Sequence, residues 1–419
     1  MDRKLNACLG VLLGACATFT PAAAQQQTSG VAGEWLATYT SARTLGLGGA
    51  YTAMADDPLG ILSNPAGLSF MDQNEVRFES ARLFEQTSIN SFGFAVPGSR
   101  WPSLGFAIVS LGTGDIERTN DVNDNLGSFK ESETAYLLTA SKSVTPKIAL
   151  GANFKMVQQS VESFNAGGFG MDLGAIVQVS RDLRLGASVM NAGGPKLKLR
   201  DVEEAYPTQV RGGAALTVFN GRGLMSLEAD HSEGLGARLH AGAEYWIQSG
   251  MALRMGWNND GGTGGFTYRF APNYAIDYAA ADHPLGLQHR IGVSAKFGGF
   301  FASSSAEPTL FSPIGEHAET RISLNSRTKA EPVTWTLDII NKSDDVVRTF
   351  GGQGQPPSHI QWDGKSETGM PLPDGIYRYN LVVKDKAGRK VEGPTHSLQI
   401  STAGPQGTVP LVPPIEVQR

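Results

Sequence analysis

Residues 236–248 read Gly-Ala-Arg-Leu-His-Ala-Gly-Ala-Glu-Tyr-Trp-Ile-Gln, and two kinds of side chain alternate along them. The apolar set is Ala237, Leu239, Ala241, Ala243, Tyr245 and Ile247, and the polar or small set is Arg238, His240, Gly242, Glu244 and Gln248, with Trp246 as the exception. A period of two indicates a β-strand with two different faces. Residues 251–258 and 290–297 alternate in the same way, so the pattern extends well beyond one segment.

The alternation recurs from residue 75 to residue 297 and predicts fourteen strands. They are expected at 75–83, 88–96, 103–111, 133–142, 147–158, 168–179, 183–191, 208–219, 223–231, 236–248, 251–258, 263–270, 273–281 and 287–297. Their lengths centre on the roughly 9–11 residues that a tilted strand needs to cross a bilayer, and bacterial barrels have an even number of strands. We therefore predict an all-β fold built on a fourteen-stranded antiparallel transmembrane β-barrel over residues 75–297.

The connections between these strands favour a membrane barrel over a soluble all-β sandwich or propeller, which also alternates. Every second connection along the chain is short in most cases, as at 143–146. The other set of connections includes the long segments 112–132 and 192–207. Outer-membrane barrels have this asymmetry, with short periplasmic turns and long outer loops. Aromatic residues also lie near strand ends on the apolar face, as an interfacial girdle would: Phe219, Trp257, Phe270, Tyr274 and Tyr278.

Composition excludes several other classes of protein. The chain has 419 residues, 51 of them Gly, with 18% charged residues and a formal net charge of −5. An acidic balance argues against nucleic-acid binding, because no basic surplus is present to neutralise phosphates. Two Cys argue against a disulfide scaffold and a cysteine-based zinc site. The lack of a further apolar run of about 18 residues argues against a bundle of membrane helices.

Residues 1–24 are predicted to be a secretory signal peptide. A basic start at Arg3-Lys4 precedes a short apolar core, and Ala22-Ala23-Ala24 supplies a cleavage site. The apolar core is too short for a transmembrane anchor. An alternative is a lipoprotein signal, in which Cys16 becomes the lipidated first residue. Cleavage after Ala24 would leave a mature chain without cysteine.

The segment from residue 25 to 74 carries the most distinctive motif. Residues 41–70 are rich in Gly, punctuated by Pro and without a sustained period, so they are expected to form loops with short helical pieces. The spacing of the glycines does not fit a phosphate-binding GxGxxG loop. The motif residues are Gly46, Gly48, Gly49, Asp56, Asp57, Asn64, Pro65, Ala66 and Gly67.

Together these residues resemble the start of the PorV/PorQ family, whose members are similar to FadL-type outer-membrane transporters. The resemblance implies a fourteen-strand barrel with an N-terminal hatch inside the lumen. It also implies a conduit or holder for hydrophobic small molecules. A candidate apolar lumen pocket consists of Val109, Leu111, Tyr136 and Leu138. Core packing against the hatch is the competing interpretation of the same residues.

The last predicted barrel strand resembles the signal by which outer-membrane barrels are recognised for assembly. Its candidate residues are Gly292, Val293, Ala295 and Phe297. The expected partners are therefore outer-membrane lipid and the barrel-assembly machinery.

A small all-β domain is predicted after the barrel. Residues 298–319 read as a linker, 320–401 as a β-sandwich and 402–419 as a Pro-rich tail. The sandwich resembles the FlgD-like Ig domain in Trp335–Ile339, Trp362–Lys365 and Pro373–Tyr377. An even number of strands puts both ends of the barrel on the periplasmic side of the membrane. The domain should therefore lie in the periplasm of a Gram-negative-type bacterium.

No enzyme is predicted, because none of the histidines of the barrel region has a hydrolase context. We expect no catalytic residue, no metal site and no cofactor. Two functions remain open: passage of a hydrophobic ligand, and service as an accessory of type IX-like protein secretion that binds or escorts cargo. The added C-terminal domain favours a secretion or other periplasmic protein partner.

Overall fold

The computed structural model describes residues 32–33, 35–36 and 41–402, apart from 84–85, 100, 181, 233–235, 249, 272, 283–285, 315–317 and 394. The predicted signal peptide, the alternative lipidation at Cys16 and the tail from residue 403 lie outside these residues.

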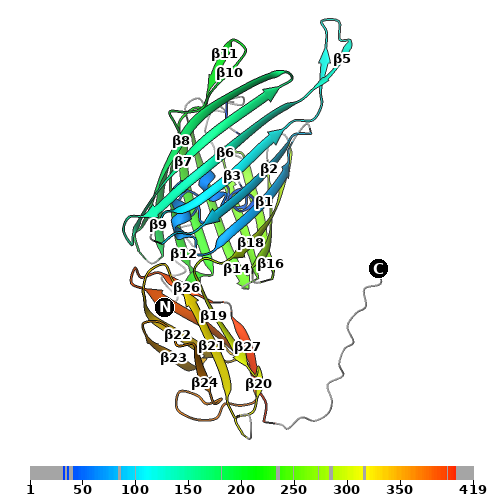
Figure 1. Cartoon of the computed structure of the whole chain (residues 1–419). Helices are drawn as coiled ribbons and strands as arrows, with labels where there is room; N and C mark the ends of the chain where they lie inside the picture. Colours follow the sequence, from blue (N-terminus) through cyan, green and yellow to red (C-terminus); the bar gives the residue numbers. More distant parts are fainter. Residues whose placement is uncertain are drawn as a thin grey trace, which may run out of the picture.

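Fourteen of the described strands form one closed antiparallel barrel (Figure 1), as predicted. They are β1 Asn74–Arg82, β2 Ser88–Val96, β3 Ser103–Gly112, β6 Glu131–Ser143, β7 Ile148–Val161, β8 Phe164–Gln178, β9 Leu183–Ala192, β12 Gln209–Val218, β13 Gly223–Ser232, β14 Gly236–Gln248, β15 Met251–Asn258, β16 Gly261–Ala271, β17 Tyr274–Ala281 and β18 Gln288–Phe297. Closure comes from β1 and β18, which pair from Asn74↔Phe297 to Arg82↔His289. The barrel therefore has no free sheet edge along its wall.

The barrel is apolar outside and largely polar inside. Large apolar side chains are exposed on every part of the outer wall, for example Leu138, Phe154, Leu173, Leu227, Met255 and Phe270. Charged side chains on the alternate positions are buried, among them Arg77, Asp172, Arg211, Glu244, Arg254 and Asp277. Soluble monomers rarely expose apolar surface on this scale. Lipid-facing apolar positions that alternate with lumen-facing polar ones are typical of a transmembrane barrel.

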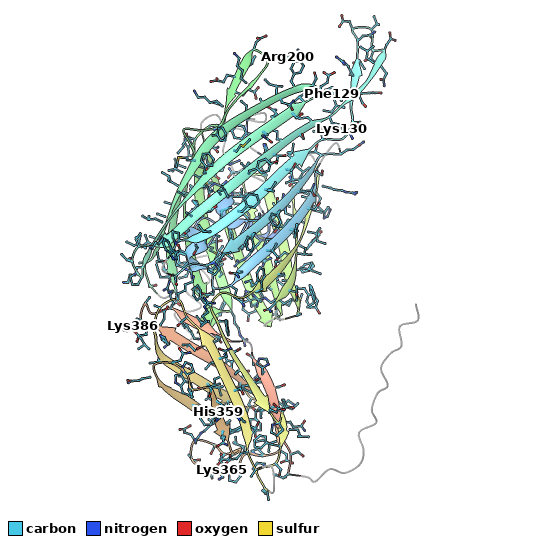
Figure 2. The ribbon with its side chains drawn as sticks, viewed as in Figure 1. Phe129, Lys130, Arg200, His359, Lys365 and Lys386 are labelled. Carbon is cyan, nitrogen blue, oxygen red and sulfur yellow. The ribbon has the colours of Figure 1, made fainter. Side chains whose placement is uncertain are left out.

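The two long connections form hairpins at one end of the barrel. One pairs β4 Ile116–Thr119 with β5 Asn125–Phe129, and the other pairs β10 Lys196–Leu199 with β11 Val202–Ala205. Figure 1 shows both at the end opposite the C-terminal domain, and Figure 2 marks this end with Phe129, Lys130 and Arg200. The barrel is therefore polarised, with its projecting loops on one side and its extra domain on the other.

Residues 41–73, here called the plug, lie within the barrel. They contain the helix α3 Ala42–Gly46 and two 3-10 helices, η1 Gly60–Leu62 and η2 Pro65–Phe70. Figure 1 shows them in blue behind the strands of the wall. Ser41 caps α3, and Asn64 caps η2 by accepting a hydrogen bond from the Ala66 N–H.

Glycines in the wall make room for the plug. A Cβ at Gly256 would lie 2.2 Å from the Gly48 nitrogen, and one at Gly174 would lie 2.0 Å from Asn64 Oδ1. Gly151, Gly186 and Gly242 meet plug backbone atoms in the same way. The high glycine content thus has a specific use here, because the plug backbone contacts the strands directly.

The C-terminal domain consists of two sheets. One contains β19 Phe301–Glu307, β21 Thr320–Arg327 and β24 His359–Trp362. The other contains β20 Leu310–Phe311, β27 His396–Ile400, β25 Gly375–Asp385, β22 Pro332–Ile340 and β23 Val346–Gln353, with β26 Lys390–Glu392 added to β25. Buried residues from both sheets, such as Ile322, Trp362, Leu337 and Tyr379, share one core.

The predicted linker at 298–319 is wrong in its extent. β19 and β20 lie inside it and pair with strands of the two sheets. Alternation in 301–307 is carried by Ala302 and Ala306 among serines, and such small side chains give a weak apolar signal. The domain therefore begins close to Phe301.

We expect Gly174→Ala to destabilise the packing of the plug, because the new methyl group would displace the Asn64 side chain. Overpacking of this kind costs about 1–3 kcal/mol. Hydrogen exchange of the amides of 60–71 should accelerate. The control is Gly212→Ala, since nothing lies within 4 Å of a Cβ there. Equal exchange in Gly174→Ala and wild type would contradict the close contact.

Candidate functional site: the plugged lumen

One side of the lumen is a buried network of ion pairs between plug and wall. Arg43 of α3 reaches Glu244 of β14 at 3.1 Å and Asp56 of the plug at 2.6 Å. Arg254 of β15 contacts the same Glu244 at 2.6 Å. Because Glu244 is 3% exposed and serves two guanidinium groups, it joins the plug to the wall electrostatically.

The network continues along the wall to the seam of the barrel. Arg254 also contacts Asp277 of β17 at 3.2 Å, and Asp277 contacts Arg77 of β1 at 2.9 Å. Arg77 in turn pairs with Glu75 and Glu79. Glu79 accepts a hydrogen bond of 2.6 Å from the Ala42 N–H at the start of α3. The buried charges are thus paired with one another, as burial requires.

Polar side chains of the wall also hold the plug backbone. Glu228 of β13 accepts hydrogen bonds of 2.8 Å from the N–H groups of Tyr51 and Thr52. Asn64 donates to the carbonyls of Ala175 and Ala187, which lie on β8 and β9. These bonds satisfy plug groups that have no partner in regular secondary structure.

The structure places the predicted motif residues as parts of this contact. Gly48 and Gly49 have φ of +67° and +93°, and they lie against Trp257 and His240. Asp57 accepts from the N–H groups of Leu59 and Gly60, and Asp56 pairs with Arg43. Gly46 lies beside Arg254, while Pro65, Ala66 and Gly67 belong to η2. The motif therefore builds and anchors the plug.

The opposite side of the lumen contains an apolar cluster beside buried polar groups such as Asn153 and Lys155 of β7. Strands β2, β3, β6 and β7 bury a cluster that includes Ile89, Val109, Ala135, Leu137 and Val157. Leu59, Ile61 and Leu68 of the plug pack against the same cluster. We call this cluster of packed side chains the apolar chamber. Barrel interiors are usually polar, so an apolar wall inside one calls for an explanation.

Two of the four residues predicted to line a pocket face the lumen, and the pocket itself stays a prediction. Val109 is fully buried in the apolar chamber, and Leu111 packs against it. Tyr136 and Leu138 point outward, with exposed fractions of 37% and 60%. Both faces of β3 are apolar, so alternation does not say which face is inside. The exposure of Leu138 places it on the lipid side, and the buried Ala135 and Leu137 take the inner positions.

The apolar chamber is covered at the hairpin end by residues that the sequence analysis did not predict. Trp35 and Leu36 come from the chain before the plug, and Leu197 and Tyr206 come from the β10–β11 region. The Trp35 indole N–H and the Tyr206 hydroxyl, the latter at 2.8 Å, donate to the same oxygen of Glu133. No motif marks these residues, because they meet only through the fold.

A groove of about 460 Å³ runs along the outer wall over β18, β1, β2 and β3. Its floor includes the inward-facing residues Glu79, Ser91 and Gly292, and its sides include Phe78 and Phe92. The Glu79 side chain occupies the space beside Gly292, where a Cβ would lie 2.9 Å from Glu79 Cγ. Both ladders of β1 are nevertheless continuous in register, so the groove does not open the wall.

The predicted assembly residues all lie on β18. Val293 and Phe297 point outward with 47% and 46% exposure, and Gly292 packs against Glu79. Ala295 pairs with Val76 across the seam. Their recognition by an assembly machinery stays a prediction.

Among the described residues, no helix has the length and apolar character to cross a membrane. The same residues contain no group of three or more His, Cys, Asp or Glu side chains arranged to hold a metal ion.

No protein-family model matches the chain, and no curated protein sequence matches it either. Among solved structures, it is similar to the toluene transporter TodX of Pseudomonas putida, with a TM-score of 0.47, 14% identity, and coverage of 61% of this chain and 96% of that chain. The CymD monoaromatic hydrocarbon channel gives 0.46 and 13%, with coverage of 62% and 97%. A FadL homologue of Pseudomonas aeruginosa gives 0.45 and 12%, with coverage of 62% and 98%. These likenesses are distant.

We expect Glu244→Gln to loosen the plug, because Arg43 and Arg254 would lose their shared carboxylate. Breaking a buried pair on one side costs about 3–5 kcal/mol. The measurement is hydrogen exchange of residues 41–60 in the detergent-solubilised protein. Glu203→Gln is the control, because its pair with Lys196 is exposed and should contribute little. Similar exchange in both variants would show that the network does not hold the plug.

Proposed function

We propose that this protein is an outer-membrane barrel that holds or conducts small hydrophobic molecules. The apolar chamber is the observation that supports this proposal. A barrel that passed only water-soluble molecules would need no apolar wall in its lumen. Buried Ile89, Val109, Leu137 and Val157 offer a ligand the kind of surface that apolar compounds bind.

The outer surface supports the location in the membrane. Its exposed apolar side chains match a lipid environment, and Phe219, Phe270 and Tyr274 near the turns match an interfacial girdle. Short turns at the domain end and long hairpins at the other end favour an orientation with the domain in the periplasm and the hairpins outside.

The proposed route has two barriers. A ligand from outside would first meet Trp35 and Tyr206, which cover the apolar chamber. It would then meet the plug, whose η2 packs through Leu68 against β3 at Gly105. Both barriers must move for passage, whereas holding a ligand requires only the first.

A second candidate function is that of a PorV/PorQ-type accessory of protein secretion. The projecting hairpins favour it, because Val122 and Leu126 of the β4–β5 hairpin and Val202 of the β10–β11 hairpin are exposed. Such apolar tips suit contact with a cargo protein. A FlgD-like Ig domain on the other side would suit a periplasmic partner.

We expect Val109→Thr to weaken binding of apolar small molecules, because the hydroxyl group would be buried without water. An unpaired buried hydroxyl of this kind should reduce affinity roughly tenfold. The measurement is native mass spectrometry of protein purified gently from its own outer membrane. Val122→Thr at the exposed hairpin tip is the matched control. Equal ligand retention in Val109→Thr and Val122→Thr would show that the apolar chamber does not bind the ligand.

The same preparation tests the second candidate. If exported proteins co-purify and are lost when the β4–β5 hairpin is shortened, the secretion role is supported. If small molecules are retained after that shortening, the hairpin is not needed for their binding.

A further inference from the structure

One side chain of the C-terminal domain enters the base of the barrel. Lys329 lies in the turn between β21 and β22, and its side chain is only 2% exposed. Figure 2 places the neighbouring turn, marked by Lys386, at the end of the domain that faces the barrel. A buried lysine at a junction between two units needs specific partners to offset the loss of hydration.

The partners of Lys329 belong to the plug. Its ammonium group donates to the carbonyl oxygens of Ser69, at 3.0 Å, and of Met71. The carboxylate of Asp72 lies 3.8 Å away, and the ring of Phe300 lies 5.5 Å from the nitrogen. All three plug residues lie at or directly after the carboxyl end of η2. A cation there satisfies carbonyls that the helix leaves free.

The helix held in this way is the piece of the plug that rests on the lower wall. Leu68 of η2 is fully buried, and Ser69 Oγ lies 2.7 Å from Ser141 Oγ of β6. Ser141 also donates to the carbonyl of Ala66. Lys329 therefore contacts the carboxyl end of η2 from the side of the C-terminal domain.

A second contact comes from the chain that leaves the barrel. The Phe300 N–H donates to the Asp72 carbonyl at 2.5 Å. Gly299 has a φ of +78°, and a Cβ there would lie 2.5 Å from the same oxygen. This turn therefore folds back onto the plug just before the domain begins, and it brings the Phe300 ring beside Lys329.

We propose that the C-terminal domain locks the plug: Lys329 holds the carboxyl end of η2 in place, and withdrawal of the domain from the barrel loosens the plug. This function is separate from any ligand in the lumen. It gives the domain a direct effect on the permeability of the barrel. A partner that binds the domain and draws it away would act on the plug through this lysine.

Burial and the neighbouring carboxylates act on the pKa of Lys329 in opposite directions. Burial lowers the pKa of Lys329 to about 8, although Asp72 opposes this shift. Burial also raises the pKa of Asp72. The other charged groups that act on the lysine are Arg389 and Asp385. Burial therefore acts against the charged lysine, and the carbonyl groups of Ser69 and Met71 and the carboxylate of Asp72 offset this cost.

The test uses the full-length protein in planar lipid bilayers. We expect Lys329→Met to raise the fraction of time spent in conducting states about tenfold, as loss of a charge-assisted hydrogen bond would. Hydrogen exchange of the amides of 66–71 should accelerate in parallel. Lys386→Met is the matched control, because that lysine lies at the same end of the domain, is exposed and pairs only with Glu331 in the described contacts. Current and exchange equal to wild type in Lys329→Met would overturn the proposal.

A second variant separates the lock from a folding defect. Lys329→Cys with Asp72→Cys can be bridged by a bifunctional thiol reagent long enough to replace the two native side chains, whose charged ends lie 3.8 Å apart. The bridged protein should be closed and the unbridged protein should conduct, within one preparation. A bridge that leaves the current unchanged would overturn the proposal. The ion current reports on the plug whether or not an apolar ligand binds.

Discussion

The seam between β1 and β18 is the constraint on which the other features depend. Backbone N–H and C=O groups cannot be left unpaired in hydrocarbon, so a sheet in a membrane has to close on itself. Here the pairing runs without interruption from Asn74↔Phe297 to Arg82↔His289. Closure turns one face of every strand toward lipid and the other toward an enclosed lumen. The outer side chains must then be apolar, and the inner side chains contact whatever fills the lumen.

The plug fills this lumen. One side of the wall binds it mainly through ion pairs, and the other side binds it mainly through apolar packing. On the side of β1 and β13–β18, carboxylates and guanidinium groups pair with one another and with Arg43 of the plug. On the side of β2, β3, β6 and β7, apolar side chains pack against Leu59, Ile61 and Leu68. Ion pairs fix position and apolar contact permits sliding, so the apolar side is the better place for a ligand or a moving segment. Lys329 adds a third contact from the C-terminal domain, at the carboxyl end of η2.

Sequence reasoning located the fourteen strands because each is a separate, local pattern of two faces. It failed where both faces have the same character. In β3 and β6 the choice of inner face is made by the neighbours, and Leu138 and Tyr136 therefore turned out to lie on the lipid side. It also missed β19, whose small side chains give little contrast. Trp35, Glu133 and Tyr206 could not be linked from sequence, because 98 residues separate Trp35 from Glu133 and no spacing rule connects them.

The sequence alone determined the number of strands, the side of the barrel with long loops, the presence of a plug motif and a following all-β domain. These follow from periodicity and from turn residues, which act over a few residues. Only the tertiary structure decided which side of the lumen is charged, which glycines admit the plug and which lysine reaches it from the domain. Each of those depends on atoms far apart in the chain that meet after the barrel has closed, and closure sets their register through hydrogen bonds that no local pattern records.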